Sequence, residues 1–502
     1  MVGIRMKNEV NEESEISEES EISEETGSSE KTGINGKLKS NEESEILTRE
    51  RRIFAEYPVP KAVAAMVVPT IISQIITVIY NLADTWYVGL TGNAAAVAAI
   101  SLCLPVYNIM TAFGNLFGIG GSSVIARSLG TGDEKRAQTA FSLAVRGAFV
   151  AAASYAILLF LFARSFLMCI GGDASSIDYA VWYTYITMVI GGIPTILSAV
   201  FAHLIRSTGE SKQASFGITL GAILNMILDP LFMFVILPRG NEVLGAAIAT
   251  AVSNAAAMIY FIVYILRSRE NVIFRLMLEK SSKITSTLVD ILKCGIPSFF
   301  LLAAGQISNF FLNGMIAEMG ASAAVAGIGV VRKIDSLAYA VNQGITQGML
   351  PIVAYCFASH KIHRMKSVVG FSSALTLGFS LLCSVVSYVF APQLIRFFIN
   401  DADTIYYGAK FLRILCIAVS IYPVLFVIIA VFQAVGQSAK PFLLSLLHKG
   451  SLDIVLFFVI RKIWGLEYIL WASPIMAAIA LGVGVALVVR LFHGLHLEVE
   501  GV

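Results

Sequence analysis

The sequence predicts an all-α polytopic membrane protein whose twelve transmembrane helices form two pseudo-symmetric six-helix bundles. Of its 502 residues, 57% are hydrophobic and only 14% are charged, whereas soluble domains carry about 25% charged residues. Apolar segments long enough to cross a bilayer recur along nearly the whole chain. They are continuous runs and not alternating strands, which excludes a transmembrane barrel. An internal repeat completes the prediction.

The first segment, residues 1–55, is expected to be a disordered acidic tail. Its first 50 residues hold 14 Glu against 6 Lys and Arg, and the string NEESEI occurs twice. Such a segment buries too little apolar surface to fold. It also lacks the apolar core of a signal peptide.

The remaining chain divides into two predicted lobes, 56–270 and 286–502, joined by a cytoplasmic linker at 271–285. If the N-terminus is inside, the inner loops and flanks collect 19 Lys and Arg against 5 outside, so both termini should be cytoplasmic by the positive-inside rule. The expected spans are about 61–90, 94–124, 139–163, 179–205, 212–237, 243–267, 286–317, 322–357, 367–391, 405–435, 441–461 and 468–491.

The two lobes repeat one another in sequence. Adding 228 to first-half positions matches residues without a gap over roughly 70 positions, and the register then slips, so that Leu228-Asp229 meets Leu452-Asp453. Six spans per repeat is an even number, so both lobes share one orientation. We expect a pseudo-two-fold axis along the membrane normal, with a substrate path between the lobes. Matched pairs include Pro69 with Pro297, Asn81 with Asn309, Gly120 with Gly348 and Arg136 with Arg364.

The first span carries a polar stripe. Gln74, Thr77, Asn81 and Asp84 recur at helical spacing within Pro69–Asn93, which places them along one side of a helix. A carboxylate at the bilayer centre costs roughly 2.5 kcal/mol or more and is normally kept there for a function. We therefore predict a role for Asp84 in cation or proton coupling. The alternative is an interfacial Asp84 that the outer medium hydrates.

The fifth span supplies a second acid in NMILDP. Asn225 and Asp229 stand four residues apart and share a helix face, and Pro230 should loosen the helix locally. Two carboxylates facing one cavity would make a proton or cation switch. The alternative for Asp229 is a cap at a kink.

The second lobe lacks an acid at the corresponding place, because Asp84 matches Leu312. Its seventh span keeps an uncharged polar stripe, which predicts substrate-cavity residues at Gln306, Asn309 and Asn313. For Arg332, Lys333 and Asp335 in the eighth span, and for Asp453 near Lys449, structural ion pairs and functional roles both remain open.

No sequence motif of the chain supports an enzymatic function. The GTGD string at Gly130–Asp133 runs into a basic cytoplasmic loop, and no phosphate-binding GxxxxGK[ST] occurs. The six cysteines are scattered without a CxxC, and His360 and His363 fit no zinc pattern. We expect no enzyme, no cofactor and no metal site of the zinc type.

Several spaced motifs carry a family resemblance over about residues 55–495. The chain resembles the multidrug and toxic compound extrusion (MATE) family, in a bacterial, MepA-like subgroup. The motifs, in order, are IYNLADTWYVGLTGN, ARSLGTGDEKRAQ, RSTGESKQA, LNMILDPLF, LGAAIATAVS, PIVAYCFASHK and GLEYILWASP.

The resemblance implies a V-shaped MATE fold and antiport, in which H⁺ or Na⁺ drives export of lipophilic organic cations by alternating access. Asp84 matches the first-helix acid of the family, and Asn225 with Asp229 match the fifth-helix pair of proton-coupled relatives. Thr250 matches a sixth-helix Thr or Ser of the substrate cavity, and Pro69 matches the first-helix proline proposed as a hinge.

One departure favours H⁺ over Na⁺. Sodium-coupled relatives often carry a Glu near the position of Gln306, where this chain has no acid, although Na⁺ could still bind at Asp84, Asn225 and Asp229. The implied partners are small cationic drugs or dyes and the bilayer of the plasma membrane. We expect no nucleic-acid partner, and we expect the protein to be a monomer.

Two rival functions remain. A flippase for lipid-linked oligosaccharide or another lipid would need several cavity cations for an anionic headgroup, and only Arg146, Arg332 and Lys333 are deep candidates. A membrane-embedded enzyme would need a convergent catalytic constellation within the spans, and none is visible.

Overall fold

The computed structural model describes residues 52–238, 240–268, 272–274, 276, 283–318, 322–449 and 451–500. The predicted acidic tail lies outside these residues except for its last four. Ile53–Val502 forms one structural unit, separate from Met1–Arg52, and the description below concerns this unit alone.

The first six predicted spans are helices, and two of them change helix type on the way. The fourth is bent by 48° where η1 meets α6, and the fifth turns from α- to π-helix directly after Pro230, where loosening is expected. In chain order the elements are α2 (Val59–Leu90), α3 (Ala94–Thr131), α4 (Glu134–Cys169), α5 (Ile177–Thr184), η1 (Tyr185–Ile190), α6 (Gly192–Arg206), α7 (Ser211–Pro230), η2 (Leu231–Ile236) and α8 (Glu242–Arg267).

The second six spans follow a short 3-10 turn, η3 (Val272–Phe274), and the eleventh span of the chain is split at Lys449. The elements are α9 (Ile284–Ala317), α10 (Ser322–Ala358), α11 (Ile362–Val389), α12 (Ala391–Phe398), α13 (Ala402–Ala434), α14 (Ala439–His448), α15 (Ser451–Ile463), η4 (Leu466–Trp471) and α16 (Ala472–Glu500).

The described part of the chain is helical and contains no strand, and ten of its helices, or eleven spans with the bent pair, are long and apolar enough to cross a membrane. Of the twelve predicted spans, α10 is less apolar than this; it carries Arg332, Lys333 and Asp335 and, further along, Asn342, Gln343 and Gln347. The predicted fold class is confirmed.

Polar caps mark several helix starts at the surface. The side chains of Asn93 and Asp133 accept hydrogen bonds from the backbone N–H groups of Ala96 and Arg136, which satisfies donors that a first helical turn leaves free. Asp401 does the same before α13. The Thr404 hydroxyl and backbone N–H donate to the Asp401 carboxylate, and these hydrogen bonds lower its pKa.

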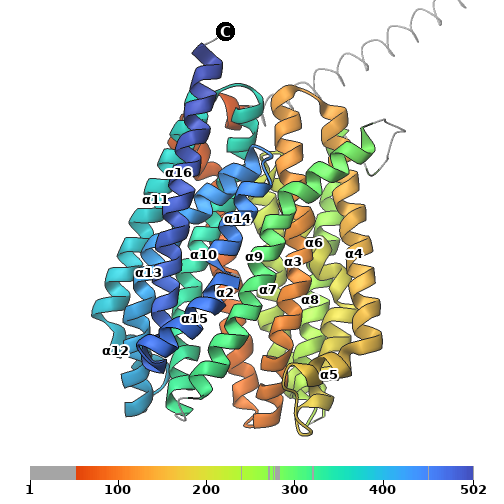
Figure 1. Cartoon of the computed structure of the whole chain (residues 1–502). Helices are drawn as coiled ribbons and strands as arrows, with labels where there is room; N and C mark the ends of the chain where they lie inside the picture. Colours follow the sequence, from red (N-terminus) through yellow and green to blue (C-terminus); the bar gives the residue numbers. More distant parts are fainter. Residues whose placement is uncertain are drawn as a thin grey trace, which may run out of the picture. The chain divides into compact units, whose positions relative to one another are not determined.

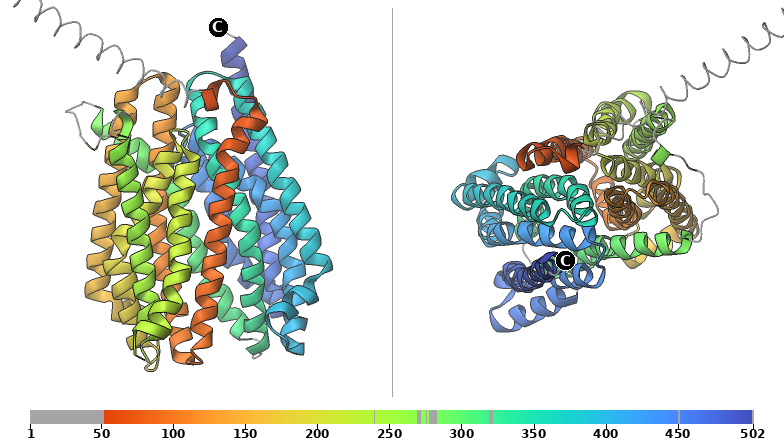
Figure 2. Two further views of the ribbon diagram at one scale, coloured as in Figure 1. Left: turned by 180° about the vertical axis from the view of Figure 1, so that it is seen from behind. Right: turned by 90° about the horizontal axis from the view of Figure 1, so that it is seen from above.

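The two halves of the chain lie side by side, with α2 against α10 and α3 against α9 (Figure 1; Figure 2). Glycines make these contacts possible. A Cβ at Gly295 of α9 would lie 1.8 Å from the Leu116 carbonyl oxygen of α3, and one at Gly120 would lie 2.1 Å from that of Ile291. Gly348 of α10 packs closely on α2, where an added Cβ would lie 2.8 Å from the Val67 Cα.

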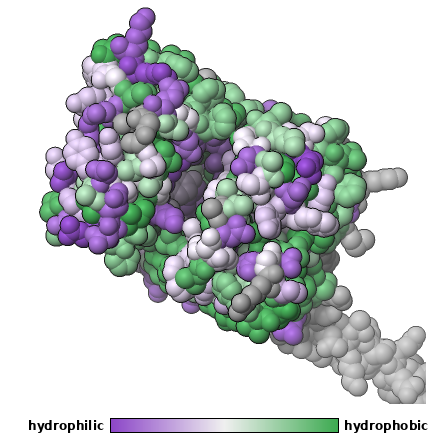
Figure 3. All heavy atoms as spheres, turned by 90° about the horizontal axis from the view of Figure 1, so that it is seen from below, coloured by the Kyte–Doolittle hydropathy of each residue, from purple (hydrophilic) through white to green (hydrophobic). Residues whose placement is uncertain are grey.

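Polar groups reinforce this contact near the face that holds the chain ends. Arg127 of α3 donates to the carbonyl oxygens of Gln433 and Ala434, at 3.5 and 3.2 Å, and the Ser123 hydroxyl donates to the Gln433 carbonyl at 2.6 Å. The opposite face is hollowed between the halves, with hydrophilic residues around the hollow (Figure 3). The halves are therefore closed on one face and open on the other.

Candidate functional site

A cavity of about 330 Å³ lies between the two halves. Helices α2, α3, α6, α7 and α8 form most of its wall, and α9 and α10 close the other side. Its polar lining residues are Ser73, Gln74, Thr77, Tyr80, Tyr107, Thr111, Asn115, Thr195, Ser198, His203, Arg206, Asn225, Thr250, Ser253, Asn254, Tyr339, Gln343 and Gln347.

The predicted stripe on α2 reaches this cavity in part. Gln74 and Thr77 line it, and Tyr80 continues the row where Asn81 was expected. The Asn81 side chain is exposed and stands outside the lining residues. Pro69 lies inside α2, which continues through it without a break.

The pair on α7 faces α8. Asn225 is 3% exposed and Asp229 is fully buried. The Asn225 Nδ2 donates to Asp229 Oδ1 at 3.2 Å and to the Thr250 hydroxyl at 3.4 Å. The other oxygens, Asn225 Oδ1 and Asp229 Oδ2, are buried and have no hydrogen-bond partner among the described residues.

Asp84 of α2 belongs to the same neighbourhood. One of its carboxyl oxygens, Oδ1, is likewise buried without a described partner. Its charge interacts with that of Asp229 and with the hydroxyls of Tyr80 and Tyr107. We call Asp84, Asn225 and Asp229 the acid site.

The acid site presents three buried acceptor oxygens that no donor of the described residues reaches. Three buried, unpartnered oxygens are unusual, because buried polar atoms are nearly always hydrogen-bonded and leaving one unpaired costs about 1–3 kcal/mol. A proton on a carboxyl group would supply a donor, and a hard monovalent cation would accept oxygen ligands. The described residues contain no cluster of three His, Cys, Asp or Glu that could hold a transition metal.

Arg206 lies at the end of the cavity away from the acid site, and in the sequence it is one of the 19 basic residues counted in the inner loops and flanks. It is 3% exposed, and its Nη1 donates to Gln347 Oε1 at 3.4 Å. Gln74 Nε2 donates to the same oxygen at 3.2 Å. Gln347 of α10 therefore joins two first-half helices across the cavity.

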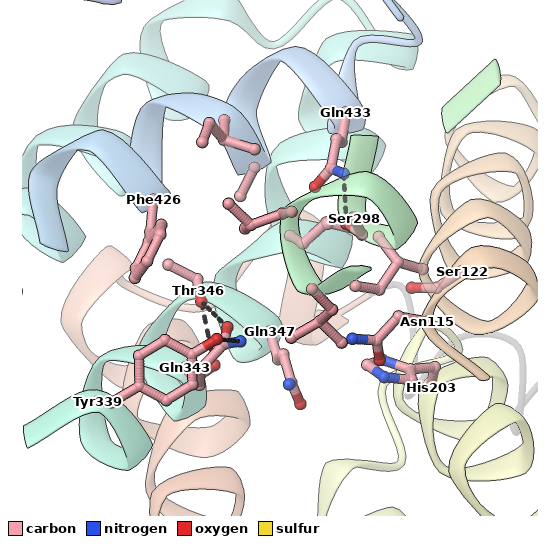
Figure 4. Close-up of a pocket in the computed structure, with 16 residues that line it drawn as sticks. Asn115, Ser122, His203, Ser298, Tyr339, Gln343, Thr346, Gln347, Phe426 and Gln433 are labelled. Carbon is pink, nitrogen blue, oxygen red and sulfur yellow. Dashed lines mark hydrogen bonds between the residues drawn. The ribbon is translucent and has the colours of Figure 1, made fainter. Parts of the chain in front are cut away.

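A smaller cavity of about 50 Å³ adjoins the first and shares several lining residues with it (Figure 4). Gln343 donates to the Tyr339 hydroxyl at 2.8 Å, and Gln433 donates to the Ser298 hydroxyl at 2.6 Å. These residues come from α9, α10 and α13, so the second half also presents polar groups to the interface between the halves.

The second-half stripe predicted on the seventh span lies elsewhere. Gln306 and Asn309 are half-buried and Asn313 is exposed, and none of them lines either cavity. Helix α10 supplies the second-half polar wall instead, through Tyr339, Gln343 and Gln347. Their spacing of four residues places them on one helix face, a signal that the sequence contained.

The deep basic residues also differ from expectation. Arg146 is exposed and donates to the Leu276 carbonyl at 2.9 Å, so the prediction of a deep Arg146 is wrong. The reason is that α4 packs with one side only, and Arg146 lies on its outer side beside the linker. Arg332 does lie deep, with its Nη2 buried.

Two six-span halves that enclose a polar cavity, closed on one face and open on the other, define a membrane transporter. The MatE family model matches the chain twice, over residues 69–231 and 297–459, whose starts are separated by the 228 residues of the repeat. The chain belongs to the MATE family of multi-pass transporters and is not an enzyme.

Its relatives agree over most of their length. The multidrug export protein MepA of Staphylococcus saprophyticus is 27% identical over 426 residues, covering 85% of this chain and 92% of that protein. MepA of Staphylococcus aureus is 26% identical over 421 residues, covering 84% and 91%. The fold matches an outward-facing MATE family transporter at a TM-score of 0.82 and 21% identity, covering 89% and 98%.

Proposed function

We propose that this protein is a secondary active multidrug exporter that exchanges a monovalent cation for lipophilic organic cations. The acid site binds the coupling ion, and Gln74, Thr77, Tyr80 and Thr250 contact the drug in the cavity. The lobes 56–270 and 286–502 alternate access around this cavity, joined by 271–285. The names of the MepA relatives support the substrate class.

The buried, unpartnered oxygens of Asp84, Asn225 and Asp229 carry this proposal. Neither Asp84 nor Asp229 lines the cavity, but Asp229 accepts a hydrogen bond from the lining residue Asn225. With both carboxylates ionised, the negative charge behind this wall attracts an organic cation. An ion that arrives at the acid site removes that charge and favours release of the drug. The coupling is reciprocal, so drug and ion each weaken the binding of the other.

The coupling ion is H⁺ in preference to Na⁺. Among the described residues, the acid site offers only three free buried oxygens, one each from Asp84, Asn225 and Asp229. A proton needs a single acceptor oxygen, whereas a hard metal cation takes several oxygen ligands.

The test uses the purified protein in sealed vesicles loaded with a fluorescent cationic dye. We expect an imposed pH gradient to drive dye movement that a proton uncoupler abolishes, while a Na⁺ gradient at equal pH drives none. Dye movement driven by the Na⁺ gradient alone would show that the coupling ion is Na⁺ and not H⁺. The absence of any ion-driven movement would refute cation-coupled export.

We further propose that both chain ends are cytoplasmic, so that the open face points outward. In a Cys169→Ser background, which removes the exposed native thiol, His360→Cys lies on the face of the chain ends and Asp403→Cys on the open face. An impermeant thiol reagent added to intact cells should label Asp403→Cys only. Labelling of His360→Cys alone would show that the chain ends face outward, opposite to the proposed orientation.

The flippase alternative is disfavoured by the cavity lining. Arg206 and His203 are the basic side chains among the described lining residues, and an anionic diphosphate headgroup would need several convergent cations.

A further inference from the structure

The second half contains a charged cluster that the proposed export mechanism does not use. Arg332 and Asp335 come from α10, Lys449 lies between α14 and α15, and Asp453 lies in the first turn of α15. We call these four residues the second-half cluster. It combines two carboxylates with two cations, whereas the acid site has carboxylates alone.

Asp453 occupies the place in its repeat that the acid site occupies in the first. The family match relates the halves by 228 residues, which sets Asp453 on Asn225, while the Leu-Asp pairs relate them by 224, which sets it on Asp229. These registers differ by about one helical turn, so both place Asp453 on the helix face of the acid site.

Asp453 is buried and incompletely satisfied. It is 5% exposed, and the Ser308 hydroxyl of α9 donates to its Oδ2 at 3.4 Å. Its Oδ1 is buried without a hydrogen-bond partner among the described residues. In this respect Asp453 resembles Asp229, whose Oδ2 is also buried without a hydrogen-bond partner among the described residues.

Lys449 supplies the positive charge that the acid site lacks. The helix is interrupted there, since α14 ends at His448, and Lys449 has an extended backbone (φ −142°, ψ 96°). Its side chain passes Gly305 of α9, where an added Cβ would lie 3.6 Å from the Lys449 Cδ. Its ammonium interacts electrostatically with both Asp453 and Asp335. Among the described residues, neither carboxylate lies within 4 Å of it.

The remaining neighbours hold the cluster in place. The Tyr422 hydroxyl donates to Asp335 Oδ1 at 2.9 Å, and Arg332 adds a second positive charge near Asp335. His448 is 5% exposed and packs between the rings of Tyr422 and Phe426. Asp453 is therefore left with Lys449 as its counter-charge.

We propose that the second half holds a cation site related by the repeat to the acid site, and that the ammonium of Lys449, part of the chain itself, neutralises this site in place of an exchangeable ion. The second half then exchanges no ion with its surroundings, and a single site, in the first half, couples the cycle. This second statement rests on the proposed function, whereas the pairing of Lys449 with Asp453 does not.

The pairing is tested by a double-mutant cycle on the full-length protein, using Lys449→Met, Asp453→Asn and the double variant. Lys449→Met strands the buried Asp453 carboxylate, so we expect its Tm to fall by about 5 °C or more, whereas Asp453→Asn strands the half-buried Lys449 ammonium and should lower the Tm less. The double variant should recover most of that loss. The same cycle at Lys410 and Glu467, a more exposed ion pair of the same half, should show additive effects. Additive losses at Lys449 and Asp453 would overturn the pairing.

Transport separates the tethered site from an exchanging one. The double variant should keep ion-driven dye export within about threefold of the unaltered protein, because it removes a charge pair that does not exchange. A double variant as inactive as Asp453→Asn, at normal folded yield, would make Asp453 a coupling residue and overturn the proposal. Loss of ion-driven export in the unaltered protein would instead refute the proposed function and leave the stability cycle standing.

Discussion

Asp229→Asn is expected to abolish ion-driven export of cationic dye while leaving a folded protein in the membrane. Asp229 is buried next to the cavity-lining residue Asn225 and acts on the dye only through its charge. Loss of that charge should weaken dye binding by about 10-fold, or about 1.4 kcal/mol. Ion coupling should disappear altogether, because the amide of Asn does not take up a proton at neutral pH.

The substitution should not unfold the protein. Asn has the shape of Asp, its oxygen can still accept from Asn225 Nδ2, and its new amide can donate to the Asn225 Oδ1 that now has no described partner. Dye export under a pH gradient and dye binding at equilibrium are the two measurements.

Asp178→Asn is the matched control for this experiment. Asp178 is an exposed acid of the same half, in a surface ion pair with Arg164 at 2.9 Å, and such pairs contribute about 0–1 kcal/mol. The Asp178→Asn variant should export dye at the normal rate. Normal ion-driven export by Asp229→Asn, at equal protein amount, would remove Asp229 from the coupling mechanism.

Gly295→Leu is expected to prevent closure of the halves on the face of the chain ends and so to stop export. A Cβ at this position would lie 1.8 Å from a backbone carbonyl oxygen of α3, and only a shift of one whole helix could relieve this overlap. Overpacking costs of about 1–3 kcal/mol are typical when side chains can adjust. Here the backbone of a helix must move, so the closed arrangement of the halves should become less stable than the open one.

The neighbouring Cys294 provides a native reporter. Its side chain is 1% exposed and faces Arg127 across the contact. In Gly295→Leu we expect its thiol to become reactive towards a permeant reagent, and dye export to fall to the level of empty vesicles.

Gly314→Leu is the control on the same helix, because an added Cβ there meets nothing within 4 Å. It should leave both export and the reactivity of Cys294 unchanged. An unreactive Cys294 together with normal export in Gly295→Leu would show that this close approach is not required for the transport cycle.

Much of the architecture was predictable from local signals. Apolar run length determined where helices lie, because unpaired backbone groups are too costly in lipid. The repeat of 228 residues determined that two similar halves exist. Asp84, Asn225 and Asp229 were identifiable because a carboxylate in an apolar run is rare and expensive.

The composition of the cavity was less predictable. Helical periodicity shows which residues share a face, but not which helix that face meets. Gln306 and Asn309 follow the repeat from the first half, yet α10 supplies the second-half wall through Tyr339, Gln343 and Gln347. Asn81 belonged to the expected stripe, and Tyr80 lines the cavity in its place.

By itself, then, the sequence determined the span pattern, the twofold repeat and the acids of the first half, since each depends on contacts along one helix or on composition. Only the tertiary structure decided that Arg206 reaches Gln347 across the cavity, and that Lys449 interacts with Asp335 of α10. These depend on the angle and depth at which separate helices pack. Side-chain packing between distant segments sets both, and no local pattern records them.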